Sequence, residues 1–306
     1  MKEASLQKKL LELFKLSEES GIDISQEMDK LEDKIEEASK TDTAWNRVEL
    51  ARHPQRPYAL DYINRIFEHF TELHGDRYFG DDPAIVGGLA FLDGRPVTVL
   101  ANQKGRTLAE RVHRNGGMAN PEGYRKALRL AKEAEKFRRP IICFVDTVGA
   151  YPGLGAEERG IGEAIARNLR DFSQLKTPIV CIIIGEGGSG GALGICVGDK
   201  VYMLENAIYS VISPEGCASI LLRDSSQAKK AAAMLRITSA DLMNFNVING
   251  IINEPEGGAH VNPDLTASAI KSVLLKDIAD LQSRTPEVLV RYRNQKIQKI
   301  GHWHEG

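Results

Sequence analysis

Apolar residues recur at two different spacings along the chain, and the change of spacing separates its helices from its strands. Up to about residue 45 they recur every three or four positions, as at Leu6, Leu10 and Leu13, which is the spacing of one helix face. The stretch SGIDIS interrupts this pattern and predicts a turn between two helices. We therefore predict an N-terminal helical segment over 1–45 and a larger domain over 46–306.

The segment after residue 50 passes from helical spacing to strand-like runs. Ile63, Ile66 and Phe70 fall on one face of a helix that we predict from Leu60 to about Leu73. Beyond it, AIVGGLAFLDGRPVTVLANQKG contains two apolar runs on either side of an Asp-Gly pair. That pair is typical of a two-residue turn, so the pattern predicts a β-hairpin.

A helix followed by a buried strand occurs twice in the middle of the chain. NPEGYRKALRLAKEAEKF predicts a helix with Asn120 as its N-cap, and AEERGIGEAIARNLRDFSQL predicts a second helix. Each leads into a near-continuous apolar run, and the run at Ile179 begins 38 residues after the run at Ile141. Such runs are typical of strands buried on both faces, so we predict a layered α/β core. Two further helices are expected after Asn262-Pro263 and Thr285-Pro286.

The composition is that of an ordinary globular protein, with 42% hydrophobic residues, 27% charged residues and a net charge of −2. This balance does not indicate binding to nucleic acid or to an anionic membrane. No apolar run reaches the ~20 residues of a membrane span. The first residues lack the apolar core of a signal peptide. We therefore expect no membrane contact and a cytoplasmic location.

The cysteines and histidines do not follow a metal-binding pattern. The four cysteines are Cys143, Cys181, Cys196 and Cys217, and no two of them form a CxxC pair. There is also no HExxH motif. Cys143 and Cys181 fall inside apolar runs, where a thiol usually acts as a small buried hydrophobic group. We expect this chain to hold no metal of its own.

The glycine cluster GEGGSGG fits three kinds of site. Gly185, Gly187 and Gly190 spell GxGxxG, which is the dinucleotide-binding pattern. The cluster also spells GxSxG around Ser189, the turn that presents a nucleophile in α/β-hydrolases, and His260 is the only plausible partner histidine. In the third kind of site the backbone N–H groups of the cluster, and no side chain, carry the chemistry.

The backbone site is the one that the rest of the sequence favours. A dinucleotide fingerprint opens its domain and leads into a long helix, whereas this cluster lies deep in the chain and leads into a short one. A hydrolase would need an upstream oxyanion segment that is missing, and Ser189 fits better as the N-cap of the short helix. Small residues let a ligand approach the main chain, and the first N–H groups of a helix lack internal partners. We therefore predict that Gly190 and Gly191 donate backbone N–H groups to a developing oxyanion.

Several motifs resemble one known family. GEGGSGGALGICVGD followed by YSVISPEGCASIL is similar to the carboxyltransferase α subunits of bacterial acetyl-CoA carboxylase, which belong to the crotonase superfamily. ARHPQRPY, PEGYRKALRL and GAYPGLGAEERG resemble the same subunits, and the resemblance closely covers about residues 46–262. It implies an α/β crotonase fold, whose core is a superhelix of ββα units. An N-terminal helical hairpin and C-terminal helices would flank this core.

The resemblance also implies a reaction. The family transfers the carboxyl group of carboxybiotin, carried by the biotin carboxyl carrier protein, to acetyl-CoA and forms malonyl-CoA for fatty acid biosynthesis. Its α and β subunits form an α2β2 heterotetramer, and biotin carboxylase belongs to the larger complex. The family's β subunit carries a zinc ribbon, so this chain would bind no cofactor itself. Gly190 and Gly191 match the α-side donors to the ureido oxygen of biotin. A non-catalytic scaffold for the β subunit and a serine hydrolase using Ser189 are the alternatives.

Other residues are expected around the same cleft, because ligands gather at the carboxyl ends of strands. The candidate substrate contacts are Gly187, Gly188, Ala192, Val148, Gly149 and Tyr151. The basic residues that could meet CoA phosphates are Arg52, Arg56, Lys104, Arg106, Arg125 and Lys126, although solvated surface is the default for each. Glu215 suits a capping or turn-fixing role better than that of a catalytic acid.

Overall fold

A computed structural model describes Lys30 and residues 43–301 of the chain. The predicted helical segment over 1–45 therefore lies almost entirely outside the described residues, and the boundary at residue 46 stays a prediction. The described residues form two compact units. One joins residues 43–47 to Pro214–Arg236, and the other contains Val48–Ser213 and the residues from Ile237 onward.

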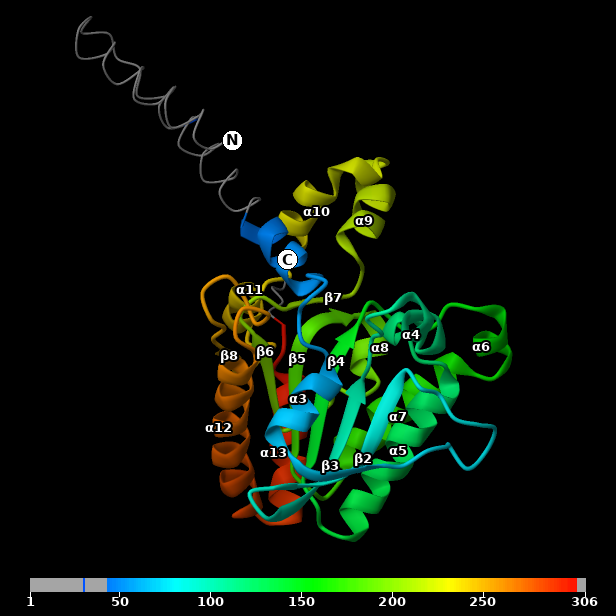
Figure 1. The fold of residues 1–306 in the computed structure, drawn as a ribbon, viewed down its shortest axis with the longest axis vertical. Coiled ribbons are helices and arrows are strands. Elements are labelled where there is room, and N and C mark those ends of the chain that lie inside the picture. The colour runs from blue at the N-terminus through cyan, green and yellow to red at the C-terminus, as the bar shows by residue number, and fades with distance from the viewer. Residues whose placement is uncertain (1–29, 31–42, 302–306) are drawn as a thin grey trace, which may run out of the picture. The chain divides into compact units, whose positions relative to one another are not determined.

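The larger unit is built on one twisted sheet (Figure 1). Its described strands are β1 (Glu68–Glu72), β2 (Ile85–Leu92), β3 (Arg95–Asn102), β4 (Ile141–Thr147), β5 (Ile179–Gly188), β6 (Lys200–Leu204), β7 (Ile208–Ser210) and β8 (Gly250–Ile252). The strand order is β1-β2-β3-β4-β5-β6-β8, and β7 pairs with the end of β5. The strands from β3 to β8 pair in parallel. Their carboxyl ends therefore lie at one edge of the sheet.

The β2–β3 hairpin is confirmed where the sequence predicts it. Asp93 and Gly94 join the two strands with φ values of +49° and +73°. Both residues thus adopt the left-handed conformation that a two-residue hairpin turn with this twist requires. The ladder runs in register from Ile85↔Asn102 to Leu92↔Arg95.

The helix predicted from Leu60 to about Leu73 is wrong in its second half. Helix α3 spans Ala59–Ile66, and the chain then becomes extended and forms β1. Thr71 of β1 lies against β2, where a side chain at Gly88 would collide with its carbonyl group. The pairing of β1 with β2 therefore outweighs the helical spacing of the apolar residues.

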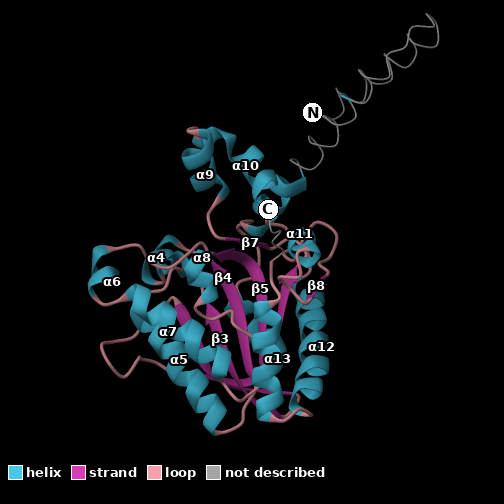
Figure 2. Ribbon diagram, turned by 180° about the vertical axis from the view of Figure 1, so that it is seen from behind, coloured by secondary structure: helices cyan, strands magenta, loops and turns pink. Residues whose placement is uncertain are grey.

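The repeated helix–strand pattern is confirmed as the centre of the fold. Helices α5 (Pro121–Lys136) and α7 (Ile161–Gln174) pack on each other and cover one face of the sheet (Figure 2). They precede β4 and β5, and every residue of β4 is buried. Asn120 is the N-cap residue of α5, although its side chain makes no capping hydrogen bond. The short helices that leave the strand ends are α4 (Leu108–His113), α6 (Leu154–Glu158) and α8 (Ser189–Leu193).

The opposite face of the sheet carries α3, which lies in front of the strands in Figure 1. The two predicted C-terminal helices are α12 (Pro263–Gln282) and α13 (Pro286–Gln298), which contact α3 and α7 respectively. Helix α11 (Ser239–Asn244) precedes β8. Within the described residues, no helix is long and apolar enough to cross a lipid bilayer.

The smaller unit contains α9 (Pro214–Cys217), a π-helical turn over Ala218–Leu222 and α10 (Ala228–Leu235). Glu215 lies in the first turn of α9, and the capping or turn-fixing role predicted for it stays a prediction. The ammonium group of Lys229 lies 5.8 Å from the centroid of the Trp45 ring.

One buried arginine fastens α13 to the core. Arg293 is 1% exposed, and its guanidinium donates hydrogen bonds to the carbonyl groups of Phe172, Leu175 and Thr177 at 2.8–2.9 Å. It also forms an ion pair with Asp199 at 2.8 Å. The three carbonyl groups lie where α7 ends and the chain turns toward β5. Arg293 thus fixes this turn as well as the helix.

We expect Arg293→Met to lower the free energy of unfolding by about 3–5 kcal/mol, because it leaves a buried carboxylate without its partner. The measurement is urea unfolding of the purified chain. Arg291→Met is the matched control, since Arg291 is exposed. A loss for Arg293→Met no larger than that for Arg291→Met would contradict this role.

Candidate functional site

Two glycine-rich turns meet at the carboxyl ends of β4 and β5. A side chain at Gly188 would collide with the carbonyl group of Val148. A side chain at Gly191 would collide with the backbone of Gly149 and Ala150. The structure thus brings the two predicted turns into direct backbone contact, and glycine is required at both positions.

Ser189 is not the N-cap residue that the sequence predicts. Helix α8 begins at Ser189 itself, its N-cap is Gly188, and no side chain caps it. Ser189 has a φ of +48°, a left-handed conformation that is uncommon for a residue other than glycine. Its hydroxyl group has no hydrogen-bond partner among the described residues. The unusual backbone of Ser189 re-aims the chain from β5 into α8.

The predicted donors lie in the first turn of α8. Gly190 is half-buried, whereas Gly191 and Ala192 are buried. N–H groups in the first turn of a helix have no partner within that helix, so they are available to an acceptor from outside. A side chain at Gly190 would meet only Ile165, at an ordinary contact distance of 3.7 Å. Gly190 is therefore the more open of the two predicted donors.

A hollow of about 280 Å³ lies beside Gly190, and we call it the apolar hollow. It is lined by Ser189, Gly190, Leu193, Tyr209, Ser210, Val211, Leu242 and Val247. Of the predicted substrate contacts, Gly187 faces Tyr209, while Gly188 and Gly149 belong to the contact between the turns. Val148 is 46% exposed, Tyr151 is half-buried and Ala192 is buried, and none of these three lines the hollow. The sequence interpretation missed the walls from β7 and α11, because no local pattern marks them as neighbours of the glycine turn.

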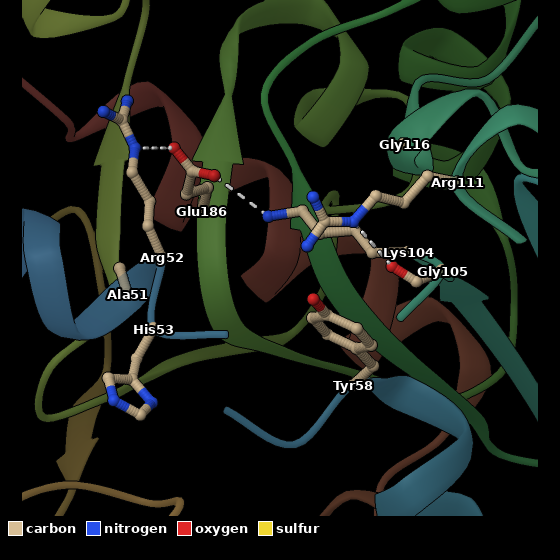
Figure 3. A pocket seen from close by; sticks show the side chains of 9 residues that line it. All are labelled: Ala51, Arg52, His53, Tyr58, Lys104, Gly105, Arg111, Gly116 and Glu186. Carbon is tan, nitrogen blue, oxygen red and sulfur yellow. Dashed lines mark hydrogen bonds and ion pairs between the residues drawn. The ribbon is translucent and has the colours of Figure 1, made fainter. Parts of the chain in front are cut away.

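A second hollow, of about 220 Å³, lies near Glu186 at the end of β5, and we call it the charged hollow (Figure 3). It is lined by Ala51, Arg52, His53, Tyr58, Lys104, Gly105, Arg111, Gly116 and Glu186. The Lys104 ammonium donates to Glu186 Oε2 at 2.9 Å and pairs with Asp146 Oδ1 at 2.8 Å. The Arg52 Nε donates to Glu186 Oε1 at 2.7 Å. Of the six basic residues predicted from the sequence, the structure places Arg52 and Lys104 together here.

Burial and ion pairing act against each other in the charged hollow. Burial alone would raise the pKa of Glu186, but the nearby cations of Lys104 and Arg52 outweigh it and lower that pKa. Burial alone would lower the pKa of Lys104, but the carboxylates of Asp146 and Glu186 outweigh it and raise that pKa. Glu186 and Lys104 are therefore both charged at neutral pH.

Arg111 and Tyr58 leave polar groups open to the charged hollow. The Arg111 Nε donates to the carbonyl group of Gly105 at 3.2 Å. The two terminal nitrogens of Arg111 have no partner among the described residues, and neither has the Tyr58 hydroxyl group. Donors of this kind fit a planar carboxylate or a phosphate oxygen. Nothing in the sequence singles out Arg111, because the predicted basic residues came from other segments.

The other four basic candidates are held by acids elsewhere. Arg56 and Lys126 are buried and bind Glu254 and Asp81, each at 2.6 Å. Arg125 binds Asp76 at 2.8 Å, and Arg106 forms a short ion pair with Asp61. Burial of Arg56 and Lys126 contradicts the expectation that they are solvated. Arg56 and Lys126 are therefore not available to CoA phosphates, and a contact by Arg106 or Arg125 stays a prediction.

The histidine of the hydrolase alternative has a different environment. His260 stacks on His53, with ring centroids 3.7 Å apart. Burial, the ring of His53 and the charge of Arg56 lower the pKa of His260. Within the described part of the chain, no hydrogen bond joins it to Ser189. This geometry does not favour a serine nucleophile.

All four cysteines are buried and unpaired. Among residues 30 and 43–301, no group of three or more histidine, cysteine, aspartate or glutamate side chains could hold a metal ion. Some buried side-chain polar atoms have no hydrogen-bond partner, and they include both polar atoms of Asn102 and the hydroxyl group of Tyr62. Neither residue lines the apolar hollow or the charged hollow.

Comparison with known proteins gives a consistent result for the whole chain. A family model described as acetyl co-enzyme A carboxylase carboxyltransferase-like matches residues 2–301. The acetyl-coenzyme A carboxylase carboxyl transferase subunit alpha of Treponema denticola is 69% identical over 290 residues, which are 95% of each chain. The subunit of the same name from Fusobacterium nucleatum is 54% identical over 300 residues, covering 97% of this chain and 96% of that one.

Solved structures give the fold. A chain of a Pseudomonas malonate decarboxylase hetero-tetramer in complex with coenzyme A has a similar fold, with a TM-score of 0.58 and 17% identity. The match covers 72% of this chain and 89% of the malonate decarboxylase chain. Transcarboxylase 12S matches 69% of this chain and 40% of its own, with a TM-score of 0.56 and 22% identity. At such identities the likeness concerns the fold alone. It confirms the predicted α/β fold of the crotonase type.

The lowered pKa of Glu186 predicts how the stability of the chain depends on pH. A lowered pKa means that ionised Glu186 stabilises the folded state above about pH 4.5, the ordinary value, and that this contribution is lost as pH falls through the lower, folded-state pKa. Glu186→Gln should therefore lower the free energy of unfolding most at pH 7. The difference in this free energy between the variant and the wild type should shrink below pH 4.5. Urea unfolding between pH 3 and 7 measures this, with the exposed Glu163→Gln as control. A difference that does not change with pH would contradict the assignment.

Proposed function

Because the chain belongs to the family of acetyl-CoA carboxylase carboxyltransferase α subunits, we propose that its two glycine turns hold the reacting end of carboxybiotin during carboxyl transfer to acetyl-CoA. The single observation that carries this assignment is the open first turn of α8 beside the apolar hollow. There Gly190 lines a space for a ring system, and Gly191 follows it in the same turn. In this proposal biotin is a substrate that the carrier protein delivers, and the chain holds no cofactor of its own.

The donors stabilise the charge that appears when the carboxyl group leaves. The bond between the ureido nitrogen of biotin and the carboxyl carbon breaks, carbon dioxide departs, and the electron pair stays on the ureido group as an enolate-like anion. N–H donors aimed at the ureido oxygen lower the energy of that anion. The anion then takes a proton from the methyl group of acetyl-CoA, and the resulting carbanion attacks carbon dioxide to give malonyl-CoA. No side-chain base is needed in this sequence of steps.

The two hollows suit two parts of the substrates. The apolar hollow has Leu193, Leu242 and Val247 in its walls and suits a compact ring with few polar atoms. The charged hollow has the open terminal nitrogens of Arg111 and suits an anionic group. A carboxylate and a phosphate of CoA are both anions of this kind. We assign the charged hollow to the anionic part of a substrate and the apolar hollow to the biotin ring.

A β subunit supplies the other half of the proposed site. The relatives are named as α subunits, which implies a partner of another kind. We propose an α2β2 assembly in which the β subunit carries the zinc ribbon and holds the acetyl-CoA enolate. The carrier protein and biotin carboxylase complete the reaction sequence in this proposal, and the cytoplasmic location stays a prediction. A purely non-catalytic scaffold would not need the backbone access that the turns provide.

The central test is to assay the chain alone and together with a zinc-ribbon carboxyltransferase β subunit. We expect malonyl-CoA-dependent carboxylation of free biotin to stay at background for the chain alone, because half of the site is missing. Activity should appear on co-expression with the β subunit. Full activity of the isolated chain would overturn the shared site, and an inactive but assembled pair would favour the scaffold.

A pair of variants at one position tests the backbone donor. Gly190→Pro removes the N–H group from the first turn of α8, where no hydrogen bond within the helix is lost. Gly190→Ala keeps the N–H group and has room for its methyl group. With the β subunit present, we expect Gly190→Pro to lower kcat about 10²–10³-fold, the usual cost of one oxyanion donor, and Gly190→Ala to stay close to wild type. Circular dichroism and assembly with the β subunit serve as folding controls.

The Ser189 hydroxyl group is tested in the same assay. Ser189→Ala should be mild, since this hydroxyl has no described partner and no role in the proposed steps. A loss of about 10⁴-fold or more in a folded variant is the scale of a lost nucleophile and would restore the hydrolase alternative.

Equal losses of kcat in Gly190→Pro and Gly190→Ala would mean that side-chain bulk at residue 190, and not the N–H donor, determines the activity.

A further inference from the structure

The pairing of β4 with β5 is irregular just before the two glycine turns. Val145 pairs with Ile183, and the next pair is Thr147 with Gly187. One residue of β4, Asp146, therefore lies opposite three residues of β5, from 184 to 186. An irregularity of this kind bends a strand and re-aims the chain that follows, and such bulges are common next to active sites.

The carboxylate of Asp146 fills the bulge. Its Oδ1 accepts the backbone N–H of Glu186 at 2.9 Å, which the interrupted ladder cannot pair in the regular way. A side chain at Gly185 would collide with the same carboxylate and would have to displace it. Asp146 is 1% exposed. Its carboxylate thus takes the place of a strand partner for β5.

Lys104 ties a third strand to the same point. It lies two residues after the end of β3, and its ammonium group lies 2.8 Å from Asp146 Oδ1 and 2.9 Å from Glu186 Oε2. Asp146 and Glu186 are the residues that lead into the two glycine turns. The ends of β3, β4 and β5 are therefore joined by one buried cluster of three charges.

We propose that Asp146 is a positioning residue, which sets the bulge in β5 through its acceptor oxygen and thereby holds the turn after Glu186 against the turn after Asp146. The contact between these turns leaves no spare space, since side chains at Gly188 and Gly191 would collide with the facing backbone. A change in the bulge would shift the Gly190 N–H group relative to its target. This inference rests on the proposed role of the glycine turns, and it adds the residues that fix their geometry.

Two variants of Asp146 separate its acceptor from other effects. Asp146→Ala removes the acceptor of the Glu186 N–H, and Asp146→Asn keeps an acceptor oxygen in the same place. With the β subunit bound, we expect Asp146→Ala to lower kcat about 10²-fold, the scale of a misplacement near 1 Å, with little change in KM for acetyl-CoA. Asp146→Asn should recover most of the activity.

Amide hydrogen exchange on the chain alone gives a readout that does not depend on activity. Asp146→Ala should speed exchange of the amides from Gly187 to Ala192, and Asp146→Asn should leave their exchange close to wild type. If the wild-type pair proves inactive, the proposed function fails, but the exchange experiment still decides the positioning role.

Gly185→Ala reaches the bulge without removing a charge. Its methyl group would collide with the Asp146 carboxylate and push it away from the Glu186 N–H. We expect the same loss of kcat and the same faster exchange as in Asp146→Ala. Gly162→Ala is the matched control, because a side chain at Gly162 meets nothing within 4 Å. Should Asp146→Ala not fold, Gly185→Ala decides the same question.

Two results would overturn the proposal. One is an Asp146→Ala variant that keeps both its kcat and its slow amide exchange. The other is loss of activity in both Asp146→Ala and Asp146→Asn with unchanged exchange from Gly187 to Ala192, which would place the carboxylate in the chemistry itself. Rescue by asparagine together with slow exchange restored is the result that supports positioning.

Discussion

The contact between two backbone turns is the constraint on which the candidate site depends. The backbone of the turn after β4 fills the space that side chains of the turn after β5 would need. Parallel strands end at one edge of a sheet, so the topology brings the turns near each other, and glycine lets the backbones touch. The site is therefore a property of two chain segments held at a fixed distance. Side chains around it serve mainly to keep that distance.

Buried ion pairs in this fold join segments that lie far apart in the sequence. Arg56 joins the N-terminal part to Glu254, and Arg293 joins the last helix to Asp199. Lys104 joins three strands at the point where the glycine turns begin. A buried pair adds little net stability, but removal of one partner is costly. Such pairs therefore select which segments meet, and this selection is what a site made of backbone needs.

Local signals account for the parts of the fold that the sequence predicts well. The Asp-Gly pair, the Asn-Pro start of α5 and the apolar runs of β4 and β5 each act within a few residues. The helix predicted over the segment of β1 is wrong, because the apolar residues of that segment have helical spacing. Only the pairing with β2, which is distant in the sequence, makes the segment a strand. The left-handed backbone of Ser189 and the walls of the hollows were missed for the same reason. They depend on contacts between segments that no local pattern describes.

The glycine cluster fits three templates in the sequence because all three need close approach of a ligand to the main chain. What separates them lies outside the cluster. A dinucleotide site needs a long helix, but α8 has five residues. A hydrolase needs a histidine bonded to its serine, but His260 is stacked on His53. The third kind of site, in which backbone N–H groups lie beside an apolar hollow, is the one that remains. A site with donors and no base fits a substrate that brings its own base, and the ureido group of biotin becomes one when its carboxyl group leaves.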